Sequence, residues 1–420
     1  MSVRPSSRQL GVLLVLGFAS GLPATVLGDP LKLSLQAAGV EPATLVRLAA
    51  VVSLVMGLKV LWAPLVDGVT LPLGRRRGWM LLMQLGLLVA IAALGQIAAV
   101  GPLLWAAVVL IAVLSATQDV AVNAFTCEAC DDRWRPLGAG LSVWGYRAAI
   151  LVAGTGGLLV AQHWGWPLAF AVLALAMVPC ALASVLASEP PAPAPATWRD
   201  TIVAPLRALW LGHGPRLLLI AVFILLFRLP DQIGNSLAAP FLKSQGYDLA
   251  ALALWRNGLG LAGTAVGVLA GGFMAVRLGH VPTLVVAGVL AALSNGAYLL
   301  MAAGYLPGIP GLATLTLVET ACGGMAGAAF VAYLMSFCTA GLAGTQYALL
   351  TSIMALGGSL IVPFGRLPAS SWGYEGFFLA SVVAAVPGLM LVPWLTRRVT
   401  AETAGSDSAP GPAGRPDSRG

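Results

Sequence analysis

Twelve separate runs of mostly apolar residues fill most of this chain of 420 residues. A membrane-spanning helix needs ~20 such residues. In hydrocarbon every backbone amide must find a partner within the structure itself, so isolated apolar runs of this length are expected to be helical. The predicted spans lie near 10–28, 44–65, 79–99, 102–124, 138–162, 166–187, 216–240, 249–277, 281–303, 307–333, 343–368 and 374–395. The sequence therefore predicts an all-α integral membrane protein with 12 transmembrane helices.

The charge content agrees with a membrane protein. Charged residues make up only 9% of the chain, whereas a soluble domain carries roughly 25%. This composition excludes a soluble enzyme, and the lipid bilayer becomes the expected surroundings. The net charge of +7 comes from basic residues scattered between apolar runs, a pattern that sets membrane orientation. No nucleic-acid partner is expected.

Lysine and arginine are divided unequally between the two sets of loops. Fifteen arginines fall on the side that carries both termini. The other side has four basic residues, Lys32, Arg47, Lys243 and Arg366. Because basic loops stay in the cytoplasm, we expect both termini to be cytoplasmic.

Three short stretches recur at nearly one offset, which indicates an internal duplication. The matches are Gly21-Leu-Pro23 with Arg228-Leu-Pro230, Gly39–Leu45 with Gly246–Leu252, and Trp164–Phe170 with Trp372–Phe378, at offsets of 207, 207 and 208. The sequence predicts two pseudo-symmetric six-helix bundles, 1–187 and 216–395, with a proline-rich cytoplasmic linker, 188–215, and a disordered cytoplasmic tail, 396–420. This resembles the major facilitator arrangement, which holds the substrate between its halves.

Charged side chains inside the predicted spans are the main candidates for function. They are Lys59, Asp119, Arg147, Arg228, Asp231, Arg256 and Glu319. A charge at the bilayer centre costs at least ~2.5–3.5 kcal/mol, so such residues are expected to line a cavity or to pair. Four are basic and three acidic, which favours an anionic substrate. The acids can pair with these bases or carry a proton.

Two of these positions allow alternative interpretations. Asp231 lies three residues after Arg228, so a local ion pair competes with a role in binding substrate or protons. Arg256 lies a turn or two into its span, and it either faces the cavity or reaches the membrane interface.

The remaining charges favour a functional interpretation. Glu319 is the only charge between Arg277 and Arg366, so we expect it to be a proton-coupling carboxyl. The residues expected at the cavity are Lys59, Asp119 and Arg147.

An acid followed by a basic cluster marks the loop between the second and third predicted spans. Asp67 precedes the run Arg75, Arg76 and Arg77. The positive-inside rule explains the arginines but not the acid. The combination resembles the signature loop of major facilitators, in which these residues form a cytoplasmic gate.

Motifs for other chemistry are missing. The sequence has no Walker loop, no HExxH and no GxSxG. Cys127 and Cys130 form a CxxC, but the three histidines lie elsewhere, so free thiols are expected. We expect no catalytic residues, no metal site and no cofactor.

Several strings resemble the AmpG-like permeases of the major facilitator superfamily. They include Gly17–Pro23, Leu58–Asp67, Gly74–Trp79, Ser115-Ala-Thr-Gln-Asp119 and Gly145-Tyr-Arg147 in the first half, and Glu319, Ala329–Met335 and Thr345–Leu350 in the second. The resemblance implies a monomeric, proton-coupled secondary transporter of the bacterial inner membrane that imports a bulky anion, an anhydromuropeptide, by alternating access. By motif match it places Lys59, Gln118, Asp119 and Arg147 at the substrate. Arg228 and Asn123 are further candidates for substrate binding, and Glu319, Asp119 and Asp231 are the candidates for proton coupling.

One departure from the family pattern keeps other functions open. The family string continues with an acid and a Tyr-Arg pair, where this chain has Asn123, Phe125 and Thr126. Asn123 cannot take up a proton. A related branch that imports siderophores such as ferric pyochelin fits this change, because such substrates are also bulky and acidic. A non-transporting sensor or a membrane enzyme is a further alternative.

Overall fold

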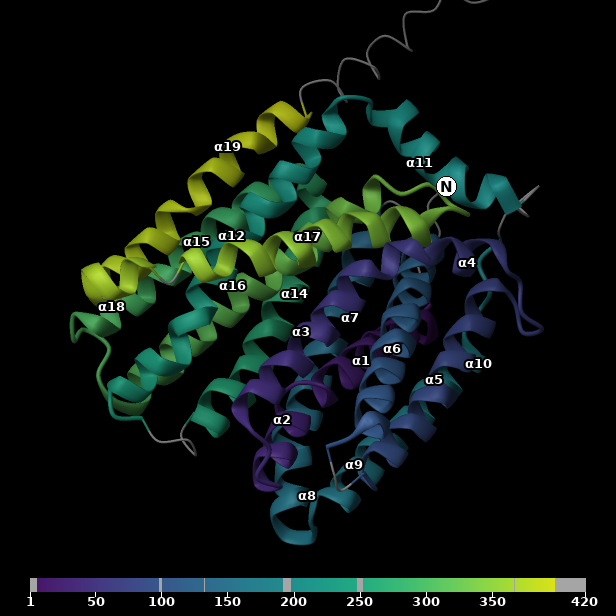
Figure 1. Ribbon diagram of the computed structural model, residues 1–420. Helices are drawn as coiled ribbons and strands as arrows, with labels where there is room; N and C mark the ends of the chain where they lie inside the picture. The colour runs from purple at the N-terminus through teal and green to yellow at the C-terminus, as the bar shows by residue number, and fades with distance from the viewer. Residues whose placement is uncertain are drawn as a thin grey trace, which may run out of the picture.

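The computed structural model describes residues 6–97, 100–131, 133–191, 198–247, 252–365 and 367–396. Apart from one isolated β-bridge between Leu71 and Gly74, these residues form helices, turns and loops, with no strand among them (Figure 1). The helices are α1 (Ser7–Val26), α2 (Asp29–Ala37), α3 (Pro42–Leu58), η1 (Lys59–Leu61), α4 (Ala63–Gly68), α5 (Arg75–Leu94), α6 (Pro102–Ala129), α7 (Arg135–Ile150), η2 (Leu151–Gly156), α8 (Gly157–Trp164), α9 (Trp166–Leu175), α10 (Met177–Leu186), α11 (Trp198–His213), α12 (Arg216–Ser244), η3 (Leu252–Gly258), α14 (Leu259–Leu278), α15 (His280–Ala302), α16 (Gly308–Ser336), α17 (Ala343–Gly365), α18 (Leu367–Val383) and α19 (Ala385–Thr396).

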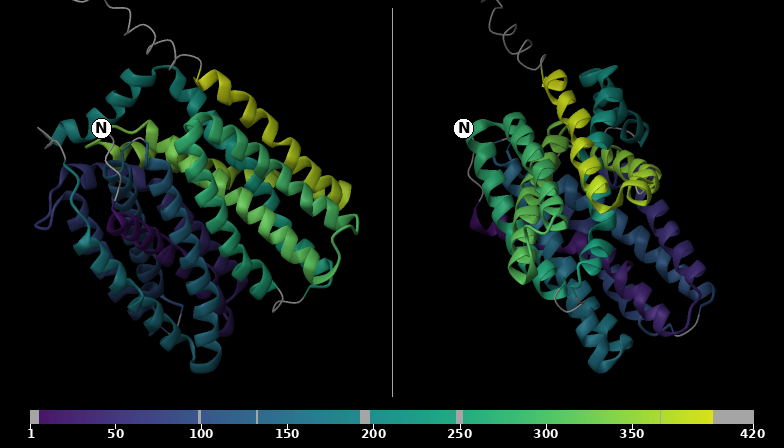
Figure 2. Two further views of the ribbon diagram at one scale, coloured as in Figure 1. Left: turned by 180° about the vertical axis from the view of Figure 1, so that it is seen from behind. Right: turned by 90° about the vertical axis from the view of Figure 1, so that its left-hand side faces the viewer.

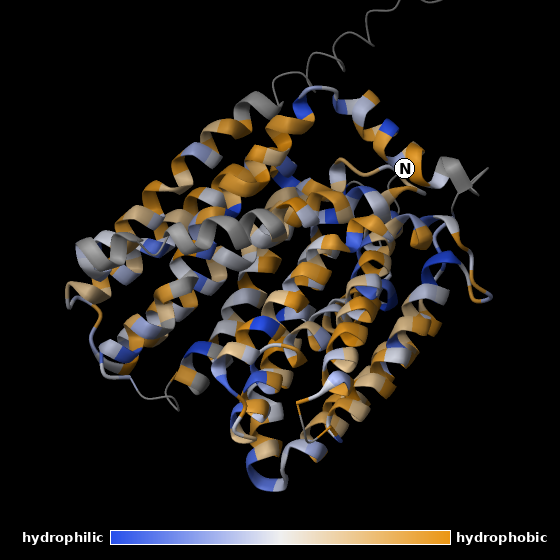
Figure 3. Ribbon diagram, viewed as in Figure 1, coloured by the Kyte–Doolittle hydropathy of each residue, from blue (hydrophilic) through white to orange (hydrophobic). Residues whose placement is uncertain are grey.

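The predicted membrane spans correspond to these helices. Among the described residues, 11 helical stretches are long and apolar enough to cross a membrane. Each of them overlaps a different predicted span, and the twelfth span, near 343–368, overlaps α17. Apolar residues predominate along these helices (Figure 3). The predicted all-α membrane fold is confirmed.

The helices form two bundles that lie side by side (Figures 1 and 2). The first bundle contains α1 to α10, and the second contains α12 to α19. α11 lies at one end of the molecule, where it packs against α4 of the first bundle and α17 of the second. We call this end the linker face.

The duplicated sequence stretches adopt matching backbone conformations. Gly39 and Gly246 have φ values of 76° and 88°, and Gly165 and Gly373 have φ values of 85° and 68°. This left-handed region is strained for residues with a side chain. Glycine therefore occupies equivalent positions of the two bundles because the same turn occurs in both.

Glycines also allow neighbouring helices to approach closely. A Cβ added at Gly267 of α14 would collide with the backbone carbonyl of Ala321 on α16. A Cβ at Gly145 of α7 would collide with the carbonyl of Leu14 on α1. Small residues at helix interfaces stabilise membrane bundles because they permit close van der Waals packing. In lipid the hydrophobic effect does not drive helices together.

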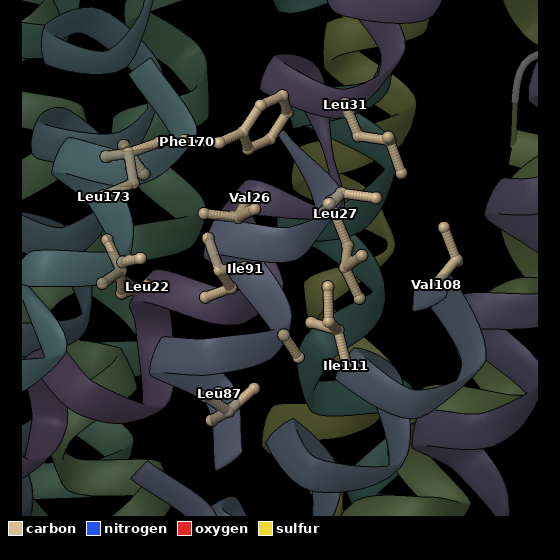
Figure 4. Close-up of a cluster of buried hydrophobic side chains, with 14 of the residues drawn as sticks. Leu22, Val26, Leu27, Leu31, Leu87, Ile91, Val108, Ile111, Phe170 and Leu173 are labelled. Atoms are coloured by element: carbon tan, nitrogen blue, oxygen red, sulfur yellow. The ribbon is translucent and has the colours of Figure 1, made fainter. Parts of the chain in front are cut away.

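Buried apolar side chains fill the space between the helices of the first bundle (Figure 4). This cluster joins four helices through Leu22 and Val26 of α1, Leu87 and Ile91 of α5, Val108 and Ile111 of α6, and Phe170 and Leu173 of α9. A second cluster crosses between the bundles, where Ala124 and Ala139 pack with Phe330 and Tyr333.

The connection between the bundles contains a helix. The proline-rich stretch 192–197 lies outside the described residues, as do Arg366 and the predicted disordered tail from 397 onward. Residues 198–213, however, form the helix α11. Its Pro205 carbonyl accepts a hydrogen bond of 3.1 Å from Gln346 Nε2 of α17. The stretch 188–215, predicted as the linker, therefore contains a helix in its second half.

Candidate functional site

A cavity of about 600 Å³ lies between the two bundles. All seven of the charged residues inside the predicted spans line it. This volume falls within the ~300–1,000 Å³ of typical small-molecule sites. The alternative for Arg256, that it reaches the membrane interface, is therefore set aside. Charges that would be costly in lipid are gathered around one polar space.

Lys59 reaches the cavity because its helix changes form there. α3 ends at Leu58, and Lys59 begins the 3₁₀ turn η1. Pro64 follows, and a proline lacks the amide that a continuous α-helix would need. Trp62 Nε1 donates a hydrogen bond of 3.0 Å to Thr117 Oγ1, which fixes this turn against α6.

Lys59 and Asp119 form an ion pair within the first bundle. Asn123, one turn after Asp119 on α6, donates from Nδ2 to Asp119 Oδ1 at 2.8 Å. Both carboxylate oxygens of Asp119 therefore have a partner. The asparagine that departs from the family pattern takes part directly in this cluster.

Arg228 and Asp231 form the local ion pair that their spacing predicts. Arg228 Nη1 lies 2.9 Å from Asp231 Oδ2 on α12. The guanidinium of Arg228 also lies over the ring of Phe330, 5.9 Å from its centroid. Both residues still line the cavity, so the pair presents a polar but locally neutral surface.

Glu319 on α16 has a tyrosine as its hydrogen-bond partner. Tyr298 of α15 donates from its hydroxyl to Glu319 Oε2 at 2.6 Å. Arg256 Nη2, from the π-helical segment η3, is 4.0 Å from Glu319 Oε1, beyond hydrogen-bonding distance. This cluster is the most loosely paired of the three.

Arg147 differs from the other three cavity cations. Within the part of the chain that the structure describes, its guanidinium has no ion pair and no hydrogen bond. The side chain is exposed to the cavity. The charged side chains that act on it are Arg228, Glu319 and Asp231, all of the second bundle. Arg147 of α7 therefore extends from one bundle toward the other.

The charges of the cavity sum to one positive charge. Three acids pair with three of the four bases, and the unpaired base is Arg147. An organic anion would complete this arrangement, because a cation in a low-dielectric site is stabilised by an opposite charge.

Gln118 is the predicted substrate ligand that the structure places elsewhere. Its side chain is fully buried, and its Nε2 donates at 2.5 Å to the carbonyl of Ala19 on α1. One residue along a helix turns the side chain by about 100°. Because Asp119 faces the cavity, Gln118 faces α1, and its role is to join the two helices.

A buried polar network joins the bundles at the linker face. Asp67 at the end of α4 accepts hydrogen bonds from Thr345 N at 2.7 Å and Thr345 Oγ1 at 2.6 Å, and from Gly344 N at 3.2 Å. These amides belong to the first turn of α17, where backbone N–H groups lack partners within the helix and favour a negative charge. Asp67 therefore caps a helix of the opposite bundle.

Arginines complete this network. Arg76 is fully buried and lies 2.8 Å from Asp67 Oδ1 and 2.6 Å from Glu128 Oε1. Arg75 Nη1 donates to the carbonyl of Gly341 at 2.6 Å, and Gly341 N donates to Glu128 Oε1 at 3.0 Å. We call Asp67, Arg75, Arg76, Glu128 and Thr345 the latch.

Sequence reasoning missed Glu128. It lies four residues beyond the predicted end of the fourth span, where an acid looks like an ordinary loop residue. A signal existed, because three arginines at one membrane face need acidic partners when they are buried.

Arg77 is not part of the latch, contrary to the prediction. Its guanidinium donates to the carbonyls of Ser184 and Val185, which end α10 of its own bundle. Basic side chains favour these helix C-termini. Its backbone amide, with that of Arg76, binds the carboxylate of Glu189 at 3.0 and 2.7 Å, respectively. Arg77 and Glu189 therefore hold the first bundle together and do not cross between the bundles.

Two thiols meet beside the latch. Cys127 Sγ of α6 donates to the carbonyl of Met335 at 3.6 Å, and Cys338 Sγ, which follows α16, donates to the carbonyl of Leu334 at 3.6 Å. The two thiols lie close enough to interact. Cys127 is buried, and both cysteines are free. The latch and these thiols lie where the two bundles meet at the linker face.

Sequence comparisons agree with this architecture. A family model described as Major Facilitator Superfamily matches residues 10–362. The anhydromuropeptide permease of Escherichia coli (strain K12) is 37% identical over 388 residues, which cover 91% of this chain and 78% of that protein. A putative transporter AmpG 4 of Rickettsia conorii is 28% identical over 402 residues, covering 92% of this chain and 96% of the relative.

Solved structures show the same fold. The human organic anion transporter MFSD10 superimposes with a TM-score of 0.69 at 16% identity, covering 93% of this chain and 100% of the other. The Escherichia coli fucose:proton symporter FucP superimposes with a TM-score of 0.70 at 13% identity, covering 92% and 98%.

Proposed function

The chain belongs to the major facilitator superfamily, and we propose that it imports a bulky organic anion together with protons across the bacterial inner membrane. Its family makes it a membrane transporter and not an enzyme. The anion we propose is an anhydromuropeptide, since the Escherichia coli relative carries that name.

The unpaired Arg147 is the observation that carries the proposal. Three neutral ion-pair clusters surround a cavity of about 600 Å³, and one cation is left without a partner. A substrate with a carboxylate would supply the missing negative charge. Lys59, Asp119, Asn123 and Arg228 would contact the rest of the solute, because they line the same space.

We propose Glu319 as the proton carrier. Its hydrogen bond comes from a tyrosine hydroxyl, which can donate to a carboxylate and accept from a carboxylic acid. Both protonation states of Glu319 can therefore keep this contact. Asp119 and Asp231, the other candidates, are each held in an ion pair, with Lys59 and Arg228 respectively.

Alternating access would proceed by rocking of the two bundles around the cavity. The positive-inside rule assigns the linker face and both termini to the cytoplasm. The latch then holds the cytoplasmic end closed, and the anion would enter from the opposite side. We propose a monomer as the transporting unit.

A siderophore importer is the second candidate, and Asn123 is the observation that favours it. The amide hydrogen-bonds Asp119 where the family pattern has an acid, so the first-bundle side of the cavity has one negative charge fewer than that pattern. A ferric chelate with acidic groups would meet less repulsion there.

Competitive uptake distinguishes the two substrates. Inner-membrane vesicles containing the protein would receive labelled anhydromuropeptide and ferric pyochelin under an imposed proton gradient. We expect muropeptide uptake that a protonophore abolishes. Uptake of the ferric chelate alone would replace the proposed substrate. Binding without movement of label in a counterflow assay would indicate a sensor.

A further inference from the structure

Two buried nitrogen atoms in the second-bundle wall of the cavity lack a hydrogen-bond acceptor. They are Arg256 Nη1 and Asn295 Nδ2, and neither has a partner among the described residues. Both residues line the cavity, and Asn295 is only 6% exposed. A buried donor without an acceptor is costly, so this wall is incomplete as it stands.

Tyr298 is in hydrogen-bonding contact with the Arg256 side chain, yet Arg256 Nη1 and Asn295 Nδ2 still have no acceptor among the described residues. Glu319 Oε2 is already bonded to Tyr298, and Glu319 Oε1 is 4.0 Å from the other terminal nitrogen of Arg256. Asn295 lies three residues before Tyr298 on α15, so the two share one helix face. The unpaired guanidinium of Arg147 on α7 interacts with the charge of Glu319 in this wall. Donors of three residues, Arg147, Arg256 and Asn295, thus line one cavity.

The opposite wall has a different character. Lys59, Asp119 and Asn123 satisfy one another through an ion pair and a hydrogen bond of 2.8 Å. Their net charge is zero. That wall is suited to hydroxyl and amide groups of a neutral ring or chain, which can exchange hydrogen bonds with an already neutral cluster.

We propose that the cavity binds its solute in one orientation, with a carboxylate held by Arg147, Arg256 and Asn295 and the neutral polar end against the first bundle. We call these three residues the donor cluster. This inference rests on the proposed function and adds the polarity of the bound solute. For an anhydromuropeptide, the peptide carboxylates would lie in the donor cluster and the sugar would face Asn123.

A matched pair of ligands tests the orientation. One ligand is an anhydromuropeptide with free peptide carboxylates, and the other is the same molecule with those groups converted to primary amides. Dissociation constants would be measured on the purified full chain in lipid nanodiscs. In the unaltered protein, we expect the acid to bind about tenfold or more tightly than the amide, because hydrogen bonds to charged groups are the stronger ones.

Asn295→Asp is the decisive variant because it keeps the size of the side chain. A second carboxylate in the donor cluster repels the acid, so the affinity for the acid is expected to fall about tenfold or more, while the amide changes less than about twofold. Asn123→Asp makes the same substitution in the opposite wall. There the two ligands should be affected by the same factor.

Asn295→Ala checks the result without an added charge, and it should also reduce the affinity for the acid more than for the amide. Equal losses for both ligands in both Asn295 variants would overturn the orientation while leaving the proposed function intact. If the unaltered protein binds and transports neither ligand, the proposed function fails and the orientation fails with it.

Discussion

Asp67 and Thr345 lie 278 residues apart and share two hydrogen bonds, of 2.7 Å to the threonine amide and 2.6 Å to its hydroxyl. Asp67 belongs to the first bundle and Thr345 to the first turn of α17 in the second. These hydrogen bonds place a full negative charge at a helix N-terminus. Arg76 Nη1, 2.8 Å from Asp67 Oδ1, neutralises that charge. Under the proposed mechanism, opening of the linker face would break this contact, and the contact would set part of the free-energy difference between closed and open states.

Asp67→Asn should shift this equilibrium toward the open state. Each hydrogen bond to a charged group contributes ~1.5–3 kcal/mol, so the loss of charge is expected to raise the open population about tenfold or more. Cys127, which is 3% exposed beside the latch, reports the change through its reaction rate with a permeant maleimide. The other four cysteines would be replaced. Arg77→Gln is the control, because Arg77 contacts its own bundle, and it should leave the rate unchanged. A rate in Asp67→Asn equal to that of the parent would contradict the role of the latch.

Cross-linking of Cys127 to Cys338 should stop transport. The two thiols belong to different bundles and lie close enough to interact. Copper phenanthroline with oxygen takes up two electrons and two protons from the pair and forms a disulfide. We expect uptake to be lost on oxidation and restored by dithiothreitol. Cys127→Ser should be insensitive to the oxidant. Continued uptake by a fully cross-linked protein would show that the bundles do not separate here.

Lys59 and Asp119 should show energetic coupling in a double-mutant cycle. Lys59→Met leaves the Asp119 carboxylate without its cation, and Asp119→Asn leaves the ammonium without its anion. Removal of one partner from a largely buried pair is more destabilising than removal of both. We therefore expect a lower melting temperature in detergent for each single variant than for the double variant. The more exposed pair Arg228 and Asp231, with side chains 27% and 24% exposed, should show a smaller coupling.

The fold and the set of cavity charges could be predicted from the sequence because both follow from the free-energy cost of placing single polar or charged groups in lipid. An apolar run must become a helix in lipid, and a charge within it must find a cavity. This reasoning placed Arg147 and Glu319 correctly in one space although they lie on different helices. It could also predict the ion pair of Arg228 and Asp231, because residues three positions apart on one helix lie on the same face.

Contacts between distant segments could not be predicted in the same way. Lys59 and Asp119 are 60 residues apart, and their pairing depends on the rotation of two helices about their axes. The family resemblance placed Gln118 at the substrate beside Asp119, but one residue along a helix turns the side chain by about 100°, and Gln118 faces α1. Arg77 looked equivalent to Arg76 in the sequence, yet one contacts α10 and the other the latch. Adjacent helical positions diverge in space even where their chemistry is identical.

Arg147→Ala should weaken transport of the anion without harming the fold. Among the described residues its guanidinium has no partner to lose, and it contacts the cavity alone. We expect KM for the anionic solute to rise about tenfold or more, with a melting temperature close to that of the unaltered protein. Arg147→Lys keeps the charge but loses the planar fork, and it should have an intermediate KM. An unchanged KM in Arg147→Ala would remove this residue from the binding site.

Glu319→Gln should separate proton coupling from substrate movement. The amide has the shape of the acid and can still accept the hydrogen bond from Tyr298, but it cannot take up a proton. We expect accumulation driven by a pH gradient to be abolished, while exchange of labelled for unlabelled solute continues. Tyr298→Phe removes the hydrogen bond and keeps the carboxyl, so gradient-driven accumulation should persist with a shifted pH profile. If Glu319→Gln still accumulates solute, the proton must travel on another cavity acid, and Asp119, which Asn123 and Lys59 bind, is the one to replace next.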